Sequence, residues 1–225
     1  LTLLRKAGFN RLSIGAQSAN NDILKFIGRR HTFEQVEKTV ALARKAGFEN
    51  YSLDLIYGLP NQTRDDWADT LNRAMSLKPK HLSCYGLKLE ENTPLYALRD
   101  SDLIPDEDAQ ADMYLYTVET LARFGYFQYE ISNFAKKGFE SKHNLKYWRL
   151  EDYAGFGASA ASNIGGIRYT YVSSPAEYID AVENGGEIIA DFEELSSYDR
   201  ASEYLMLGLR TTYGISAEEY CSIYR

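Results

Sequence analysis

The most unusual cluster of side chains in this sequence lies in the run HNLKYW, which contains His143, Tyr147 and Trp148. One helical turn would place His143 and Tyr147, which are four residues apart, on the same face. Imidazole and phenol groups both ligate haem iron, and an indole ring stacks well against a flat ligand. The same residues also suit a surface loop in which the histidine caps a backbone group, and the residues alone leave both interpretations open.

A second candidate site is a carboxylate within an apolar run. Asp54 lies between Leu53 and Leu55 in the segment YSLDLIY, and a buried charge requires a partner. A ribose diol, an ammonium group or an arginine would serve, and Arg29 is one such arginine. Gln17 ends the preceding predicted strand and is expected near the same site. A purely structural contact of Asp54 with Arg29 or with backbone is the alternative.

Weaker signals come from a lysine, a small-residue turn and two histidines. Lys88 ends a predicted strand and is expected to face the possible site. The run GFGASA, from Gly155 to Ala160, contains small side chains that let backbone N–H groups approach a ligand. His31 is expected to be solvated, and His81, at the start of a strand, is expected to be partly exposed.

Repeated strand–helix units position the first group of candidates. Thr32 and Gln35 form a predicted capping box for a helix that Gly47 ends. The alternation of strands and helices predicts parallel strands with right-handed crossovers. We therefore predict an α/β fold that forms part of a TIM-like barrel, with a doubly wound sheet as the alternative. The strands are expected at residues 11–17, 51–57 and 81–89, and the helices at 32–46 and 63–77.

The pattern changes after residue 105 and predicts an α+β region. A helix is expected at 106–124, strands at 127–131 and 167–172, and a mostly loop-like segment at 133–166. Further elements are expected at 175–183 (helix), 188–192 (strand) and 198–210 (helix).

Composition limits the class of protein. The chain has 225 residues, a net charge of −7 and 44% hydrophobic residues, as in soluble globular proteins. The acidic balance argues against broad nucleic-acid binding, and no apolar run is long enough to span a bilayer. The two cysteines are far apart and form no disulfide framework. Free thiols fit a reducing compartment, so we expect a cytoplasmic protein.

Several motifs, in order, resemble one branch of the radical-SAM proteins, which contains haem chaperones and oxygen-independent coproporphyrinogen III oxidases. The resemblance covers essentially the whole chain. The motifs are NRLSIGAQS (10–18), IGRRH (27–31), SLDLIYGLPNQT (52–63), GYFQYEISNFAKKGFESKHNLKYW (125–148), GFGASA (155–160) and EYLMLGLRTTYGI (203–215).

The resemblance implies a partial barrel of six strand–helix units, of which this chain would supply the last three within residues 1–104. An α+β extension with the HNxxYW motif would follow at 105–195, and a helical C-terminal domain would begin at 196–225. The resemblance also implies binding of S-adenosylmethionine (SAM). Asp54 would take the ribose hydroxyls or adjacent polar groups, and Gln17 and Arg29 the amino-acid end. Lys88 and Ala161 match strand-end positions of the family near the SAM site, but the resemblance implies no defined role for either.

The HNxxY motif is typical of the haem-chaperone branch. It implies that the protein carries haem b to respiratory enzymes, with His143 as a possible ligand of the haem iron and Tyr147 beside it. The alternative is oxidative decarboxylation of coproporphyrinogen III in porphyrin biosynthesis, which also needs a porphyrin-sized ligand. An unrelated barrel enzyme acting on phosphorylated sugars would need a phosphate-binding loop, for which only the Gly155 turn is available.

Two departures from the family pattern affect these expectations. The C-x3-C-x2-C loop that holds a 4Fe–4S cluster in the family is absent, and Cys84 and Cys221 cannot supply three thiolates. We therefore expect this chain to be inactive by itself and to bind SAM poorly. Ala161 also stands where many relatives carry a histidine. Because half a barrel exposes a sheet edge, we further expect self-association.

Overall fold

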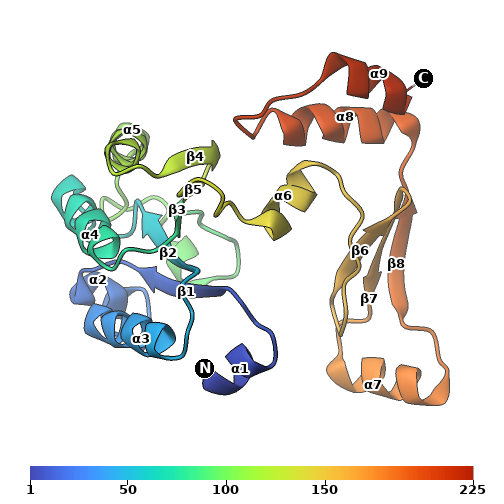
Figure 1. Ribbon diagram of the computed structural model, residues 1–225, viewed down its shortest axis with the longest axis horizontal. Helices are drawn as coiled ribbons and strands as arrows, with labels where there is room; N and C mark the ends of the chain where they lie inside the picture. The colour runs from blue at the N-terminus through green and yellow to red at the C-terminus, as the bar shows by residue number, and fades with distance from the viewer. Residues whose placement is uncertain (225) are drawn as a thin grey trace. The chain divides into compact units, whose positions relative to one another are not determined.

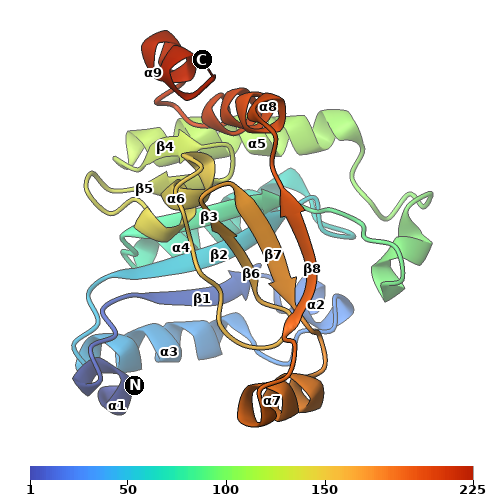
Figure 2. The same cartoon turned by 90° about the vertical axis from the view of Figure 1, so that its right-hand side faces the viewer.

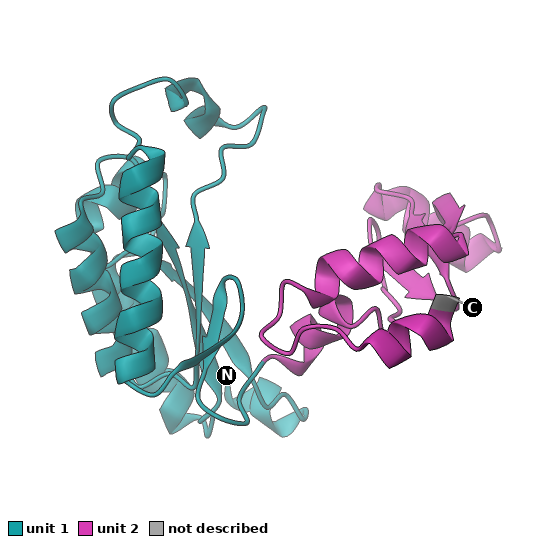
Figure 3. Cartoon of the chain, turned by 90° about the horizontal axis from the view of Figure 1, so that it is seen from above, with its two compact units in different colours: residues 1–140 teal, residues 141–225 magenta. Residues whose placement is uncertain are grey.

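The computed structural model describes residues 1–224 and divides the chain into two compact units, with the boundary between Glu140 and Ser141 (Figure 3). The three-part division expected from the sequence, at residues 104 and 195, stays a prediction. Within the described residues, every helix is too short or too polar to cross a membrane.

Unit 1 is built on an open five-stranded sheet with the order β1-β2-β3-β5-β4 (Figure 1). β1 (Leu12–Gln17), β2 (Tyr51–Tyr57) and β3 (His81–Gly86) are parallel, as the sequence predicted. β5 (Asn133–Ala135) pairs antiparallel with β3, and β4 (Phe127–Glu130) pairs antiparallel with β5. The predicted α/β fold, with three parallel strands that are each followed by a helix, is therefore confirmed.

Helices cover one face of this sheet (Figures 1 and 2). Leu53 and Leu55 of β2 are fully buried and belong to the same core as Trp67 and Leu71 of α4 and Leu121 of α5. The indole Nε1 of Trp67 donates a hydrogen bond to Thr117 Oγ1 (2.8 Å), so this large side chain is both buried and satisfied. The helical elements of unit 1 are α1 (Thr2–Lys6), α2 (Asn21–Phe26), α3 (Phe33–Lys45), α4 (Arg64–Ser76), the 3₁₀ helix η1 (Pro94–Leu98) and α5 (Glu107–Arg123).

Helix α3 shows how local sequence sets these elements. The expected capping box is present, since Gln35 Oε1 accepts a hydrogen bond from the Thr32 N–H (3.0 Å). Gly47 follows the helix with φ +88°, a conformation that favours glycine. Val36, Val40 and Ala43 are buried, but Leu42 is 59% exposed. Leu42 lies about 100° around the helix from Ala43, which places it away from the buried face.

Unit 2 contains a three-stranded antiparallel sheet, β6 (Ala161–Ile164), β7 (Ile167–Tyr171) and β8 (Ile189–Glu194). Its helices are α6 (Lys142–Trp148), α7 (Pro175–Asn184), α8 (Ser197–Gly208) and α9 (Ala217–Tyr224). Residues 133–166 are mostly loop, as expected, but the sequence interpretation missed β5, α6 and β6, which lie within them. These elements have at most seven residues, too few for a clear hydrophobic period.

Truncation of the core of unit 1 tests this packing. We expect Leu53→Ala to lower the free energy of unfolding by about 2–5 kcal/mol, because it leaves a cavity at a fully buried site. Chemical denaturation followed by circular dichroism measures the change. Leu42→Ala is the matched control and should change stability by less than about 0.5 kcal/mol. Equal effects of the two substitutions would contradict the packing described here.

Candidate ligand-binding sites

The face of the unit 1 sheet opposite the helices carries a row of polar side chains. Because side chains alternate along a strand, burial of Leu53 and Leu55 against the helices sends Ser52 and Asp54 to the other face. In the parallel register, Asp54 lies beside Gly15 of β1 and Ser83 of β3, and Ser52 lies beside His81.

Asp54 is held by two hydroxyl groups. Ser13 Oγ donates to Asp54 Oδ2 (2.7 Å), and Ser52 Oγ donates to Asp54 Oδ1 (3.3 Å). The sequence left a contact of Asp54 with Arg29 or with backbone as the alternative. The structure instead shows two serines as the hydrogen-bond partners of Asp54. A carboxylate accepts more than two hydrogen bonds, and Asp54 is only partly buried. Its remaining acceptor capacity suits a hydroxyl-bearing ligand.

Gln17 lies at the carboxyl end of β1, and Arg29 lies two residues before His31, which contacts that strand. Gln17 ends the strand, is 8% exposed and has a positive φ of 63°. A Cβ atom at Gly15 would lie 2.7 Å from the Gln17 Nε2, so a glycine is needed for this side chain to fold back over the strand. Arg29 is exposed in the loop before α3. That loop contacts β1, because His31 Nε2 lies 3.4 Å from the Ala16 carbonyl oxygen.

Lys88 follows β3 and points into solvent. Its side chain is 81% exposed and its Nζ lies 2.6 Å from Glu90 Oε1. The structure thus places its ammonium against a neighbouring acidic side chain, and an exposed ion pair of this kind contributes little to stability.

The sequence interpretation missed His81. It was expected to be partly exposed, but it is 1% exposed, with Nδ1 2.9 Å from Ser52 Oγ and Nε2 2.8 Å from Tyr129 Oη. Burial, together with the positive charge of Arg11, lowers the pKa of His81 from 6.5 to about 3. His81 is therefore neutral near pH 7. The alternation of polar and apolar residues in HLSCYG does indicate that His81 and Ser83 share one face of the strand, but it does not indicate that this face is buried at His81.

In unit 2, the HNxxYW motif forms helix α6, and Ser141 Oγ accepts a hydrogen bond from the Asn144 N–H (3.4 Å) at its start. His143 and Tyr147 meet one turn apart, as expected for residues at this spacing. The Tyr147 Oη lies 3.0 Å from His143 Nε2, and the two rings are edge to face at 5.0 Å. Tyr147 also packs edge to face on Tyr153 at 4.7 Å. His143 is exposed, so its imidazole is accessible to a ligand.

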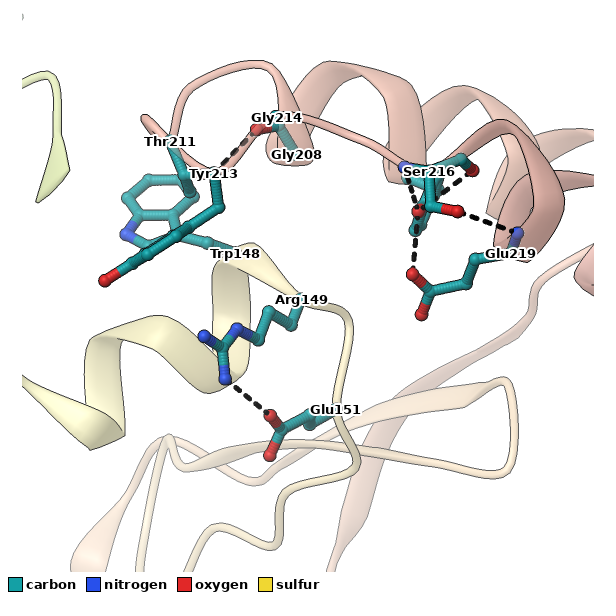
Figure 4. Close-up of a pocket in the computed structure, with 10 residues that line it drawn as sticks. Trp148, Arg149, Glu151, Gly208, Thr211, Tyr213, Gly214, Ser216 and Glu219 are labelled. Carbon is teal, nitrogen blue, oxygen red and sulfur yellow. Dashed lines mark hydrogen bonds and ion pairs between the residues drawn. The ribbon is translucent and has the colours of Figure 1, made fainter.

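A cavity of about 410 Å³ adjoins the end of α6 (Figure 4), a size found among small-molecule sites. Trp148 and Tyr213 line it, and Arg149 faces Glu151 across 3.9 Å. The Trp148 Nε1 is buried without a hydrogen-bond partner among the described residues. The three aromatic residues of the motif thus point in two directions, with Trp148 toward the cavity and the His143–Tyr147 pair exposed.

Ala161 begins β6 in unit 2 and is exposed. The adjacent small-residue turn is tight: the Gly155 N–H donates to Ser162 Oγ (2.9 Å). A Cβ at Gly155 would lie 2.4 Å from the Ala161 carbonyl oxygen, so close packing of this turn accounts for the glycine.

The cysteines do not fit a cluster-binding site. Cys84 is buried in the core of unit 1, where burial raises the pKa of its thiol, and Cys221 is exposed in unit 2. A 4Fe–4S cluster needs thiolates that converge on it. Among the described residues, no group of three histidine, cysteine, aspartate or glutamate side chains is arranged to hold a metal ion.

Comparison with known proteins agrees with this architecture. The family model of the radical SAM superfamily matches residues 1–74. The chain is similar in fold to coproporphyrinogen III oxidase (HemN) from Escherichia coli, with a TM-score of 0.81 and 24% identity over 98% of this chain and 54% of that chain.

Relatives with similar sequences identify the family within the radical-SAM proteins. The heme chaperone HemW of Bacillus subtilis is 42% identical over 100% of this chain. The mitochondrial radical S-adenosyl methionine domain-containing protein 1 of Danio rerio is 33% identical over 95% of it. The chain spans 60% and 50% of the lengths of these two relatives, respectively. The chain belongs to the HemW/HemN-like family of radical-SAM proteins.

The burial of neutral His81 predicts a pH dependence of stability. The folded state binds fewer protons than the unfolded state between the lowered pKa of about 3 and the ordinary value near 6.5. The contribution of neutral His81 to the free energy of unfolding is therefore fully present above this window. It is lost progressively as the pH falls through the window. From pH 7 to pH 5, His81 should cost about 2 kcal/mol of unfolding free energy.

The measurement is urea denaturation at several pH values for the wild type and for His81→Gln. The other histidines are common to both proteins, so the difference between the two profiles isolates His81. Parallel profiles would show that His81 is not held neutral in the fold.

Proposed function

We propose that the protein is a haem-binding chaperone that delivers haem to respiratory enzymes in the cytoplasm. The observation that supports this most strongly is the His143–Tyr147 pair on α6. An exposed helix presents an imidazole and a phenol one turn apart, and both are haem-iron ligand types. The name of the B. subtilis relative points the same way.

In this proposal His143 ligates the haem iron. Its Nε2 is hydrogen-bonded to Tyr147 Oη, so ligation through Nε2 requires the phenol to move aside. Tyr147 and Tyr153, whose rings pack edge to face at 4.7 Å, would supply aromatic surface beside the imidazole.

We also propose that unit 1 binds SAM in the intact protein. Asp54 would accept hydrogen bonds from ribose hydroxyls or adjacent polar groups, and Gln17 and Arg29 would hold the amino-acid end. Bound SAM and a 4Fe–4S cluster would supply radical chemistry, but the cysteines of this chain do not fit the cluster. We therefore propose that the chain alone has no catalytic activity, and we assign its residues binding and orienting roles only.

Haem titration followed by the Soret band tests the chaperone proposal. We expect the wild type to bind haem and His143→Ala to weaken binding at least about tenfold, because it removes a coordinate bond. Tyr147→Phe keeps the imidazole and removes the competing hydroxyl, so it should retain binding. His31→Ala, which removes a histidine of unit 1, is the matched control.

Haem binding by His143→Ala equal to that of the wild type would contradict the proposal. The oxidase alternative makes a different prediction, since the intact protein would then convert coproporphyrinogen III. A turnover assay on the intact protein distinguishes the two functions.

A further inference from the structure

The contacts that hold Asp54 continue across three strands. Ser52 Oγ lies 3.3 Å from Asp54 Oδ1 and 2.9 Å from His81 Nδ1, and His81 Nε2 lies 2.8 Å from Tyr129 Oη. Three residues of this hydrogen-bonded series are buried: Ser52 and His81 are each 1% exposed, and Tyr129 is 2% exposed. Asp54 is at the accessible end.

The direction of these hydrogen bonds follows from counting protons. An ionised carboxylate only accepts, so the single hydroxyl proton of Ser52 points to Asp54. Ser52 Oγ must then accept from His81 Nδ1–H, which leaves the lone pair on Nε2 to accept from the Tyr129 hydroxyl. Each donor therefore points toward the carboxylate. The lowered pKa of His81, about 3, is consistent with an imidazole that carries one proton.

We infer that His81 and Tyr129 are positioning residues that act through Ser52 to fix the Asp54 carboxylate for a polar ligand on the open face of the sheet. This inference rests on the proposed role of Asp54 in binding the ribose portion of SAM. Neither residue needs to touch the ligand, because each sets the orientation of the next donor in the chain.

Ser13 completes the arrangement from the neighbouring strand. Its hydroxyl donates to Asp54 Oδ2 at 2.7 Å, so each carboxylate oxygen receives one hydroxyl proton. The lone pairs left on both oxygens are then available to ligand hydroxyl groups. If His81 took the opposite tautomer, the Ser52 proton would turn toward Nδ1, and Asp54 Oδ1 would lose its donor. The tautomer of His81 thus controls the orientation of the carboxylate.

The first test reads the tautomer in the unmodified protein. ¹⁵N-histidine labelling with long-range ¹H–¹⁵N correlation distinguishes the protonated ring nitrogen from the unprotonated one. The sequence has three histidines, and His81→Asn identifies the signal of His81. We expect a neutral ring protonated at Nδ1. A ring protonated at Nε2 or at both nitrogens would overturn the inference.

The second test measures SAM binding by calorimetry in the intact, cluster-reconstituted protein. His81→Asn retains an N–H group near the position of Nδ1 and should bind SAM within about threefold of the wild type. His81→Leu removes that donor and should raise the dissociation constant roughly 3- to 10-fold, the size expected for one hydrogen bond. Tyr129→Phe should also weaken binding. Equal SAM affinity for His81→Leu and the wild type would overturn the inference.

Asp54→Asn separates this inference from the proposed function. If Asp54→Asn binds SAM as well as the wild type, then Asp54 does not bind SAM, and the inference fails together with that assignment, whatever the tautomer. If Asp54→Asn abolishes binding while His81→Leu leaves it intact, the SAM site stands and only the positioning roles fail. Circular dichroism of each variant verifies the fold.

Discussion

Parallel pairing of β1, β2 and β3 is the constraint on which the rest of unit 1 depends. The register places Gly15, Asp54 and Ser83 side by side. Since alternate residues of each strand face opposite sides, the helices bury one set of side chains, and the other set, which includes Ser52, Asp54 and Ser83, lies on the opposite face. A shift of one residue in β2 would send Asp54 into the apolar core and Leu55 to the open face. The position of the candidate SAM site is therefore inseparable from the packing of Leu53 and Leu55 against α4 and α5.

The open face is ordered by hydrogen bonds more than by apolar contact. His81 and Tyr129 are buried polar groups, and burying such groups without partners is costly. Each finds a partner, and the chain they form ends on a partly exposed carboxylate. A polar network that is satisfied in this way also limits the side chains to one arrangement. The same contacts that make burial of His81 tolerable thus also orient Asp54.

Much of unit 1 was predictable from the sequence, because capping residues and glycines mark the helices and apolar runs mark the strands. Thr32, Gln35 and Gly47 gave the limits of α3 to within a residue or two. The antiparallel β5 and the helix α6 were missed because each is too short for its hydrophobic period to repeat often enough to be recognised. His81 was misjudged because burial of a histidine depends on Ser52 and Tyr129, 29 and 48 residues away in sequence. The partners of Asp54 were missed for the same reason, since Ser13 is 41 residues from it.

A crystal structure of the intact protein with SAM bound is the most direct test of the central claim, that the open face of β1–β3 holds the ligand through Asp54. The account predicts a ligand hydroxyl or other polar group within hydrogen-bond distance of the Asp54 carboxylate, with Ser13 and Ser52 still donating to it. SAM bound elsewhere, with Asp54 contacting only the two serines, would contradict the account.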